Sequence, residues 1–277
     1  EGEFGELLEI SSRAHILDRW IVSRLHQLVR DSTKGYENCA LDEAVRGVEG
    51  FIDDLSVWYT RRSRDRLKGD TGEEDRVLAE ETLTYVLQTL AKVIAPSMPY
   101  LAERLYKITG GTSESVHLTA WPKEGAVDEK SISDMNQTRD IVSNGLMKRI
   151  EVKIPVRQPL ASASINTNLE KEYLVQISEE LNVKEVLVDV ALTEGVMLDT
   201  EITEALKNEG DTRKLIRAVQ EARKIKNLTP KDIVELTVSR SVSKEVESVC
   251  SVTIKVDELF ISDTSVDFTD GKVYYSL

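Results

Sequence analysis

The spacing of apolar residues changes near residue 151, and this change constrains the fold more than any other feature. Before it, apolar residues recur every three or four positions, which is typical of amphipathic helices. After it, short runs rich in β-branched residues alternate with one long helical stretch, which is typical of a mixed α/β domain. A chain of 277 residues is long enough for two domains. We therefore predict two domains, residues 1–149 and 150–277, in an α plus α/β fold.

The first domain is predicted to be an antiparallel helical bundle. Glycine pairs and prolines interrupt the helical spacing at short intervals, and short connections favour antiparallel neighbours. The expected helices cover residues 16–28, 41–68, 79–94, 99–109 and 132–149.

The second domain is predicted to be small and mixed. One helix is expected at residues 201–227, because its apolar residues return to helical spacing. The expected strands cover residues 152–156, 160–165, 183–192, 233–238, 252–256, 259–261 and 273–275.

Composition excludes several classes of protein. Hydrophobic residues make up 40% and charged residues 31%, and no apolar run approaches the roughly 20 residues of a membrane-spanning helix. The acidic N-terminus does not resemble a secretory signal. We therefore expect a cytoplasmic protein with no membrane partner. The two cysteines, Cys39 and Cys250, are too few and too far apart for a disulfide framework or a zinc site.

No catalytic constellation is recognisable. The sequence has no glycine-rich phosphate loop, no G-x-S-x-G motif and no H-E-x-x-H pair, and its three histidines are isolated. We therefore predict no catalytic, cofactor-binding or metal-binding residue in this chain.

Binding features are more informative than catalytic ones. The formal net charge is −13, yet three stretches are locally basic: residues 61–68, 148–157 and 213–226. On a continuous helix Arg61, Arg64 and Lys68 share one ridge and could face a polyanion together. The alternative is a solvated helix end that favours cations through the helix dipole.

Two tryptophans have competing interpretations. Trp121 precedes a proline outside any predicted helix, so it is either a core residue or a platform on which an unpaired base stacks. Trp58 lies in the apolar stripe of the second helix, and we expect it in the core.

These stretches resemble a known family. The first domain is similar to the anticodon-binding helical domain of isoleucyl-tRNA synthetase, a class I aminoacyl-tRNA synthetase, and the second is similar to its junction domain. The most specific pieces are WYTRRSR and VRQPL. The segments that carry the likeness are LDRWIVSRL (17–25), FIDDLSVWYTRRSRDR (51–66), TLAKVIAPSMPYLAERLY (89–106), SVHLTAWP (115–122), VKIPVRQPLASASI (152–165), ELNVKEVLV (180–188) and ALKNEGDTRKLIRAVQEARK (205–224).

The resemblance implies a function and a division of labour. The class signatures H-I-G-H and K-M-S-K-S are absent, so the chain resembles a C-terminal fragment of a longer enzyme. ATP and Mg would serve the full-length enzyme, which charges tRNA(Ile) with isoleucine. The partners implied are tRNA(Ile) and the remainder of the synthetase chain. The candidate tRNA-binding residues are Tyr59, Arg61, Arg62, Arg64, Lys68, Trp121 and Arg157.

Two alternatives stay open at this point. An acidic helical module that binds other proteins would need no cluster of basic residues at 61–68. The equivalent part of a valyl- or leucyl-tRNA synthetase would share the helical domain more loosely, and would not normally show VRQPL followed by LNVKEV.

Overall fold

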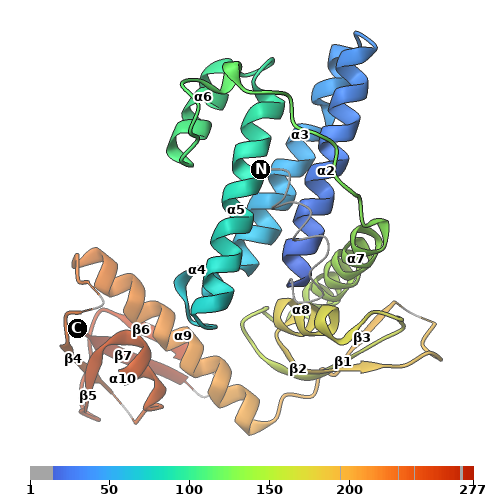
Figure 1. Cartoon of the computed structure of the whole chain (residues 1–277). Coiled ribbons are helices and arrows are strands. Elements are labelled where there is room, and N and C mark those ends of the chain that lie inside the picture. Colours follow the sequence, from blue (N-terminus) through green and yellow to red (C-terminus); the bar gives the residue numbers. More distant parts are fainter. Residues whose placement is uncertain (1–14, 194, 230, 240, 269–270) are drawn as a thin grey trace. The chain divides into compact units, whose positions relative to one another are not determined.

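The computed structural model describes residues 15–193, 195–229, 231–239, 241–268 and 271–277, and the elements are shown in Figure 1. The chain folds as two compact units that divide between Gln137 and Thr138. This division lies inside helix α7 (Glu129–Glu151), whereas the sequence places the domain boundary at the end of the same helix.

The first unit is helical, and no strand occurs within its described residues 15–137, so the predicted fold class is confirmed there. Helices α2, α3 and α5 lie alongside one another (Figure 1), and Trp20, Phe51 and Tyr59 fill the space between them with fully buried side chains. The elements are α2 (Ile16–Glu37), α3 (Leu41–Asp53), a π-helical segment η1 (Asp54–Thr60), α4 (Arg64–Lys68), α5 (Glu73–Ile94), α6 (Pro99–Ile108) and a 3-10 turn η2 (Val116–Leu118).

Local chemistry sets the ends of these helices. The ring Nδ1 of His15 accepts a hydrogen bond from the backbone N–H of Leu17 at 3.2 Å, which caps the start of α2. Pro99 occupies the first turn of α6, where its missing N–H has no cost, and Gly110 follows that helix with φ +80°. The start at Pro99 and the stop before Gly110 therefore lie where the sequence places them, whereas α2 runs on to Glu37 and α5 already begins at Glu73.

The expected continuous helix at residues 41–68 is wrong in its second half. Residues 54–60 form a π-helix, and the hydroxyl of Thr60 donates to the carbonyl of Leu55 at 2.8 Å. Its wider turns change the angular order of the side chains that follow. As a result Tyr59 is fully buried, and Trp58, which we expected in the core, is half-buried. Ser63, with ψ near 6°, then separates this segment from α4.

In its described residues the second unit combines two small sheets with four helical segments, as the predicted mixed class requires. The first sheet has the order β2-β1-β3, with β1 parallel to β2, and the second has the order β5-β4-β7-β6. The elements after α7 are β1 (Leu160–Ile165), α8 (Lys171–Leu181), β2 (Val183–Val188), β3 (Val196–Leu198), α9 (Glu204–Ile225), β4 (Val234–Val238), α10 (Glu245–Cys250), β5 (Val252–Val256), β6 (Ser265–Phe268) and β7 (Gly271–Ser276).

Each sheet has its own buried residues. Ala163 and Ile165 of β1 are buried, as are Tyr173 and Ile177 of α8. Around the second sheet, the buried core cluster is Leu215, Val219, Leu236, Val238, Val246, Cys250, Val252, Val273 and Tyr275. Helix α9 therefore contributes an apolar face to the second sheet.

Two strand predictions are wrong. Residues 152–156 form turns, because the guanidinium of Arg149 binds the carbonyls of Pro155 and Gln158 at 3.1 and 2.9 Å, and Lys153 has φ +56°. Residues 259–261 are not a strand either, and the side chains of Leu259 and Ile261 are exposed.

Candidate nucleic-acid interface

A buried ion-pair network organises the basic stretch at residues 61–68. The guanidinium of Arg66 donates to both carboxylate oxygens of Asp18 and also to Asp75, at 2.7–2.9 Å. The hydroxyl of Tyr59 donates to the same Asp18 at 2.9 Å. Arg66 is therefore a structural residue that joins α4 to α2 and α5. Burial and the Asp18 carboxylate raise the pKa of Tyr59, so its hydroxyl stays protonated.

The predicted site residue Tyr59 has no exposed surface, since its side chain is 0% accessible. A residue in this position cannot touch RNA without unfolding the bundle, so the structure removes it from the interface and places it in the core. The neighbouring residue, Trp58, is the one that reaches the surface. Trp58 is half-buried, and the guanidinium carbon of Arg61 lies 6.0 Å from the centre of its indole ring. This arrangement of a cation over an aromatic face is a cation–π contact.

The other predicted cations differ in how they are presented. Arg61 is exposed, and its Nε donates to the carbonyl of Val57 at 2.9 Å, which fixes the direction of the side chain. Arg64 and Lys68 are exposed one turn apart on α4, and Lys68 lies 3.5 Å from Asp65. Arg62 is half-buried. Arg61, Arg64 and Lys68 thus all reach solvent, although a π-helix and a break replace the single ridge that we expected.

Trp121 is anchored at the opposite end of α2. Its indole N–H donates to the hydroxyl of Thr33 at 2.8 Å, and its ring meets the ring of Tyr36 edge to face, with 5.5 Å between the centroids. The side chain nevertheless remains 36% exposed. An indole that is held by its polar edge and still reaches solvent has the properties of a stacking platform.

A cavity of about 430 Å³ adjoins Trp121 in the first unit. Its lining includes Tyr85, the fully buried Tyr106 and the cations Lys92 and Lys123. Aromatic surface beside positive charge suits an unstacked nucleotide, because the base can pack on a ring while its phosphate meets a lysine. Lys92 and Lys123 lie in separate segments and form no linear motif, so the sequence does not single them out.

In the first unit, the exposed cations at residues 61–68 lie far from Trp121. Arg66 contacts Asp18, and Trp121 contacts Thr33, so their anchor points lie about 22 Å apart along α2 at 1.5 Å per residue. The structure therefore does not bring Arg61 and Arg64 together with Trp121 at one point. A ligand that contacts both groups must be extended, as a nucleic acid is.

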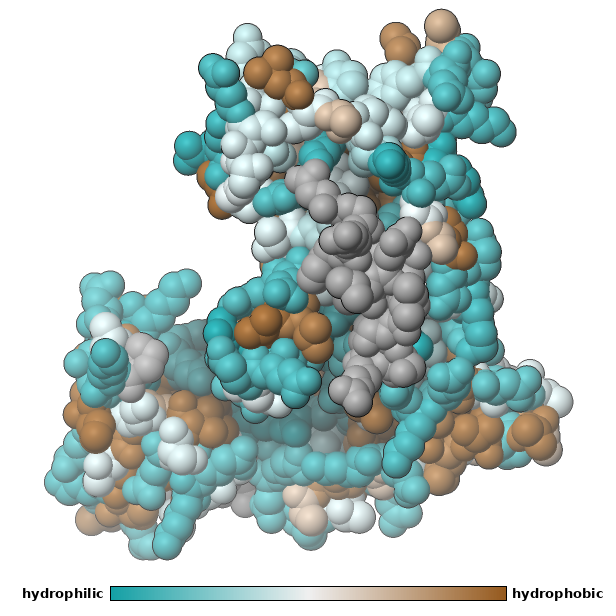
Figure 2. All heavy atoms as spheres, in the orientation of Figure 1, coloured by the Kyte–Doolittle hydropathy of each residue, from teal (hydrophilic) through white to brown (hydrophobic). Residues whose placement is uncertain are grey.

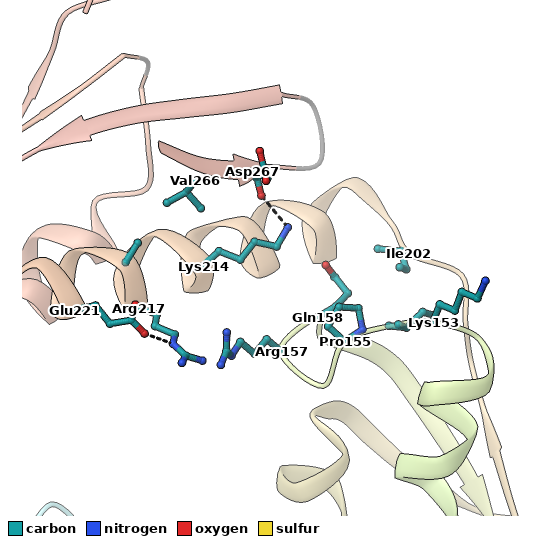
Figure 3. A pocket seen from close by; sticks show the side chains of 12 residues that line it. Lys153, Pro155, Arg157, Gln158, Ile202, Lys214, Arg217, Glu221, Val266 and Asp267 are labelled. Atoms are coloured by element: carbon teal, nitrogen blue, oxygen red, sulfur yellow. Dashed lines mark hydrogen bonds and ion pairs between the residues drawn. The ribbon is translucent and has the colours of Figure 1, made fainter. Parts of the chain in front are cut away.

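Arg157, the predicted site residue of the second unit, lines a cavity of about 720 Å³. Figure 3 shows its guanidinium directed toward Arg217 of α9, with Lys214 on the same helix. The neighbouring Gln158 donates from its amide to the carbonyl of Leu206 at 2.7 Å, which ties the loop that carries Arg157 to α9. The structure thus joins two basic stretches that are 56 or more residues apart in sequence.

The described residues offer little for other kinds of site. Among them no group of three or more His, Cys, Asp or Glu side chains is placed to hold a metal ion. No helix in the described ranges is long and apolar enough to cross a membrane. The face shown in Figure 2 is mostly hydrophilic, with apolar side chains in several separate groups. Charged and polar groups therefore dominate this face.

Comparison with known proteins defines the class. Residues 18–165, more than half of the chain, match the model of the anticodon-binding domain of tRNA ligases. The chain belongs to this family, as its resemblance predicts.

Individual proteins similar to this chain are isoleucine–tRNA ligases. The chain is 35% identical over 235 residues to the isoleucine–tRNA ligase of Dehalococcoides mccartyi strain CBDB1, and 39% identical over 178 residues to the isoleucine–tRNA ligase of Deinococcus radiodurans. It is also 35% identical over 181 residues to that of Thermoplasma acidophilum. These alignments cover 75%, 61% and 65% of this chain. They cover 23%, 16% and 17% of the relatives, so the chain spans less than a quarter of their length.

Proposed function

We propose that this chain binds the anticodon region of tRNA(Ile) as part of an isoleucine–tRNA ligase. The observation that carries the proposal is the exposed group at the end of η1, where Arg61 lies over Trp58 and Arg64 and Lys68 follow on α4. The family match supports the same ligand class. The names of the relatives favour isoleucine over the valine and leucine specificities.

The physical basis is local charge on an acidic protein. With a net charge of −13, most of the surface repels RNA, so binding depends on places where cations are concentrated. Guanidinium groups suit this role, because they hydrogen-bond phosphates in a forked geometry and also stack on bases and aromatic rings. We assign phosphate contacts to Arg61, Arg64 and Lys68, and base stacking to Trp58 and Trp121.

The proposal also assigns what this chain does not do. The activation of isoleucine with ATP and Mg²⁺ belongs to the catalytic part of such an enzyme, and the remainder of the synthetase is a partner of this chain. The described residues form no metal-binding group, and we derive no chemical step from them. We place the protein in the cytoplasm, where tRNA is charged. A module that binds other proteins would leave the exposed cations next to Trp58 without a role.

The test compares two RNAs from the same tRNA. Fluorescence anisotropy would measure the binding of the purified chain to the anticodon stem-loop of tRNA(Ile) and to a hairpin of its acceptor stem. We expect the stem-loop to bind more tightly, because the proposal assigns anticodon contacts to this chain. Equal affinity for the two RNAs would contradict anticodon binding, and no binding to either would favour the protein-binding alternative.

A further inference from the structure

A basic pocket in the second unit surrounds the candidate residue Arg157, and the contacts assigned to the first unit do not involve it. Three segments contribute its cations: Lys153 from the turn after α7, Arg157 from the following loop, and Lys214 and Arg217 from α9. Two carboxylates, Glu221 and Asp267, also line it. Four cations against two carboxylates make the pocket positive within a chain whose net charge is −13.

The pairing of these charges leaves two cations available. Nε of Arg217 lies 2.7 Å from Glu221, and Lys214 lies 2.7 Å from Asp211 and donates to the backbone carbonyl of Asp267. In the part of the chain that the structure describes, neither Arg157 nor Lys153 forms an ion pair. The guanidinium of Arg157 instead points toward that of Arg217 in Figure 3. Two guanidinium groups that share a pocket repel each other, and an anion between them would relieve the repulsion.

The loop that carries Arg157 is held in place before any ligand binds. Arg149 is fully buried and donates to four backbone carbonyls, those of Leu181, Asn182, Pro155 and Gln158, at 2.9–3.1 Å. The amide of Gln158 ties the same loop to α9. A site that is already ordered loses less conformational entropy when a ligand binds.

The chemistry of the lining selects the ligand. Its apolar residues are aliphatic, namely Ile154, Pro155, Ile202, Ala218 and Val266, and the lining has no aromatic ring on which a base could stack. Arginine recognises phosphate oxygens with paired hydrogen bonds. A site that holds phosphate but offers no base platform suits a polynucleotide backbone better than a free nucleotide.

We infer that this pocket binds a phosphate group of the RNA backbone, with Arg157 and Lys153 as its principal contacts and Arg217 beside them. The inference rests on the proposed function, since it assigns a second contact for the same tRNA. It adds a sequence-independent contact in the second unit, and such contacts fix the position of a nucleic acid on a protein.

The test removes the two unpaired cations together, as Lys153→Asn with Arg157→Gln. Asparagine tolerates the positive φ of residue 153, so the change removes charge without straining the turn. The matched control is Lys207→Gln with Lys255→Gln, which removes the same charge at surface ion pairs outside the pocket. Affinity of the whole chain for tRNA(Ile) is measured between 50 and 200 mM salt.

We expect the pocket variant to bind roughly threefold to tenfold more weakly per cation removed, with a log–log salt slope shallower by about 1 to 2. The control variant should keep the slope of the unaltered chain. If the unaltered chain binds tRNA and the pocket variant keeps its affinity and slope, the pocket inference is overturned and the proposed function stands. If the unaltered chain binds no tRNA, both are overturned.

A competition arm distinguishes the backbone from small phosphates. AMP and inorganic pyrophosphate at millimolar concentration, with matched ionic strength, should leave tRNA binding unchanged. Displacement of tRNA by either compound, absent in the Lys153→Asn, Arg157→Gln variant, would make this a small-phosphate site and overturn the backbone assignment.

Discussion

The guanidinium of Arg66 donates two hydrogen bonds to the carboxylate of Asp18, at 2.9 and 2.7 Å, and both side chains are at most 5% exposed. The arginines of the basic stretch at residues 61–68 therefore have two different roles. Arg66 holds α4 against α2, whereas Arg61 and Arg64 extend into solvent. Helical spacing groups Arg61 and Arg64 on one ridge, but the buried carboxylate that binds Arg66 lies 48 residues earlier in the sequence and is known only from the fold.

The first prediction concerns this separation. Arg66→Ala should lower the free energy of unfolding by about 3–5 kcal/mol, because it leaves the buried carboxylate of Asp18 without its cationic partner. Arg64→Ala should change it by less than about 0.5 kcal/mol, because the side chain is exposed. Urea denaturation of the two variants measures the difference. Equal losses would show that Arg66 has no special structural role.

The second prediction concerns pH and the start of α2. Burial lowers the pKa of His15 below its ordinary value of 6.5, and the nearby charge of Arg66 acts in the same direction, outweighing the opposite effect of Asp18 and Asp75. The unfolded chain therefore binds a proton more readily than the folded chain. The stability that His15 contributes is complete above about pH 6.5 and is lost as the pH falls through the folded-state pKa.

His15→Asn tests this effect, since asparagine can cap the helix but does not titrate in this range. We expect the melting temperature to fall less between pH 7.5 and pH 5.5 in the variant than in the unaltered chain. An identical fall in both would assign the pH dependence to other groups.

The third prediction concerns Trp121. Because its ring is partly exposed, Trp121→Ala should weaken tRNA binding by about 1–3 kcal/mol while leaving the salt dependence nearly unchanged, as the loss of a stacked base does. The control is Thr33→Val, which removes the hydrogen bond to the indole but keeps the ring. A Trp121→Ala chain that melts normally and binds tRNA with full affinity would remove this residue from the interface.

The fourth prediction concerns the close approach of Gly210 to Gln158. A Cβ at position 210 would lie 2.4 Å from the side-chain oxygen of Gln158, whose amide ties the Arg157 loop to α9. Gly210→Ala should therefore cost about 1–3 kcal/mol of stability through overpacking. Gly50→Ala is the matched control, because a Cβ at this position in α3 would meet no atom within 4 Å other than the neighbouring backbone of its own helix. This control should be stabilising by roughly 0.5–1 kcal/mol, and a loss of equal size at both positions would contradict the argument.

The fold follows from the sequence wherever apolar spacing alone decides it. The helical character of the first unit and the strands at residues 160–165 and 252–256 are predicted correctly for this reason, although α2 and α5 are longer than predicted. The π-helix at residues 54–60 is missed, because wider turns are compatible with the same apolar residues and only packing selects them. Residues 152–156 have strand-like composition, but the distant contacts of Arg149 determine their conformation.

The candidate interface is predictable only in part. Arg61, Arg64 and Trp121 can be selected from the sequence, because a basic helix end and a tryptophan outside any helix are local features. Their exposure in the structure agrees with their proposed roles. The sequence does not reveal that Trp58 is partly exposed, because in the π-helix Tyr59 is the residue that is fully buried. Lys92 and Lys123 are missed because they approach Trp121 only in the folded chain.

The measurement that tests the central claim most directly is the salt dependence of tRNA(Ile) binding by Arg61→Gln, Arg64→Gln. Its control is Arg46→Gln, Arg104→Gln, which removes two exposed arginines from α3 and α6. If Arg61 and Arg64 hold phosphates, the variant binds more weakly and its log–log slope becomes shallower by roughly 1 to 2, while the control keeps the original slope. Unchanged affinity and slope in the Arg61, Arg64 variant would contradict the claim and leave residues 61–68 as a solvated helix end.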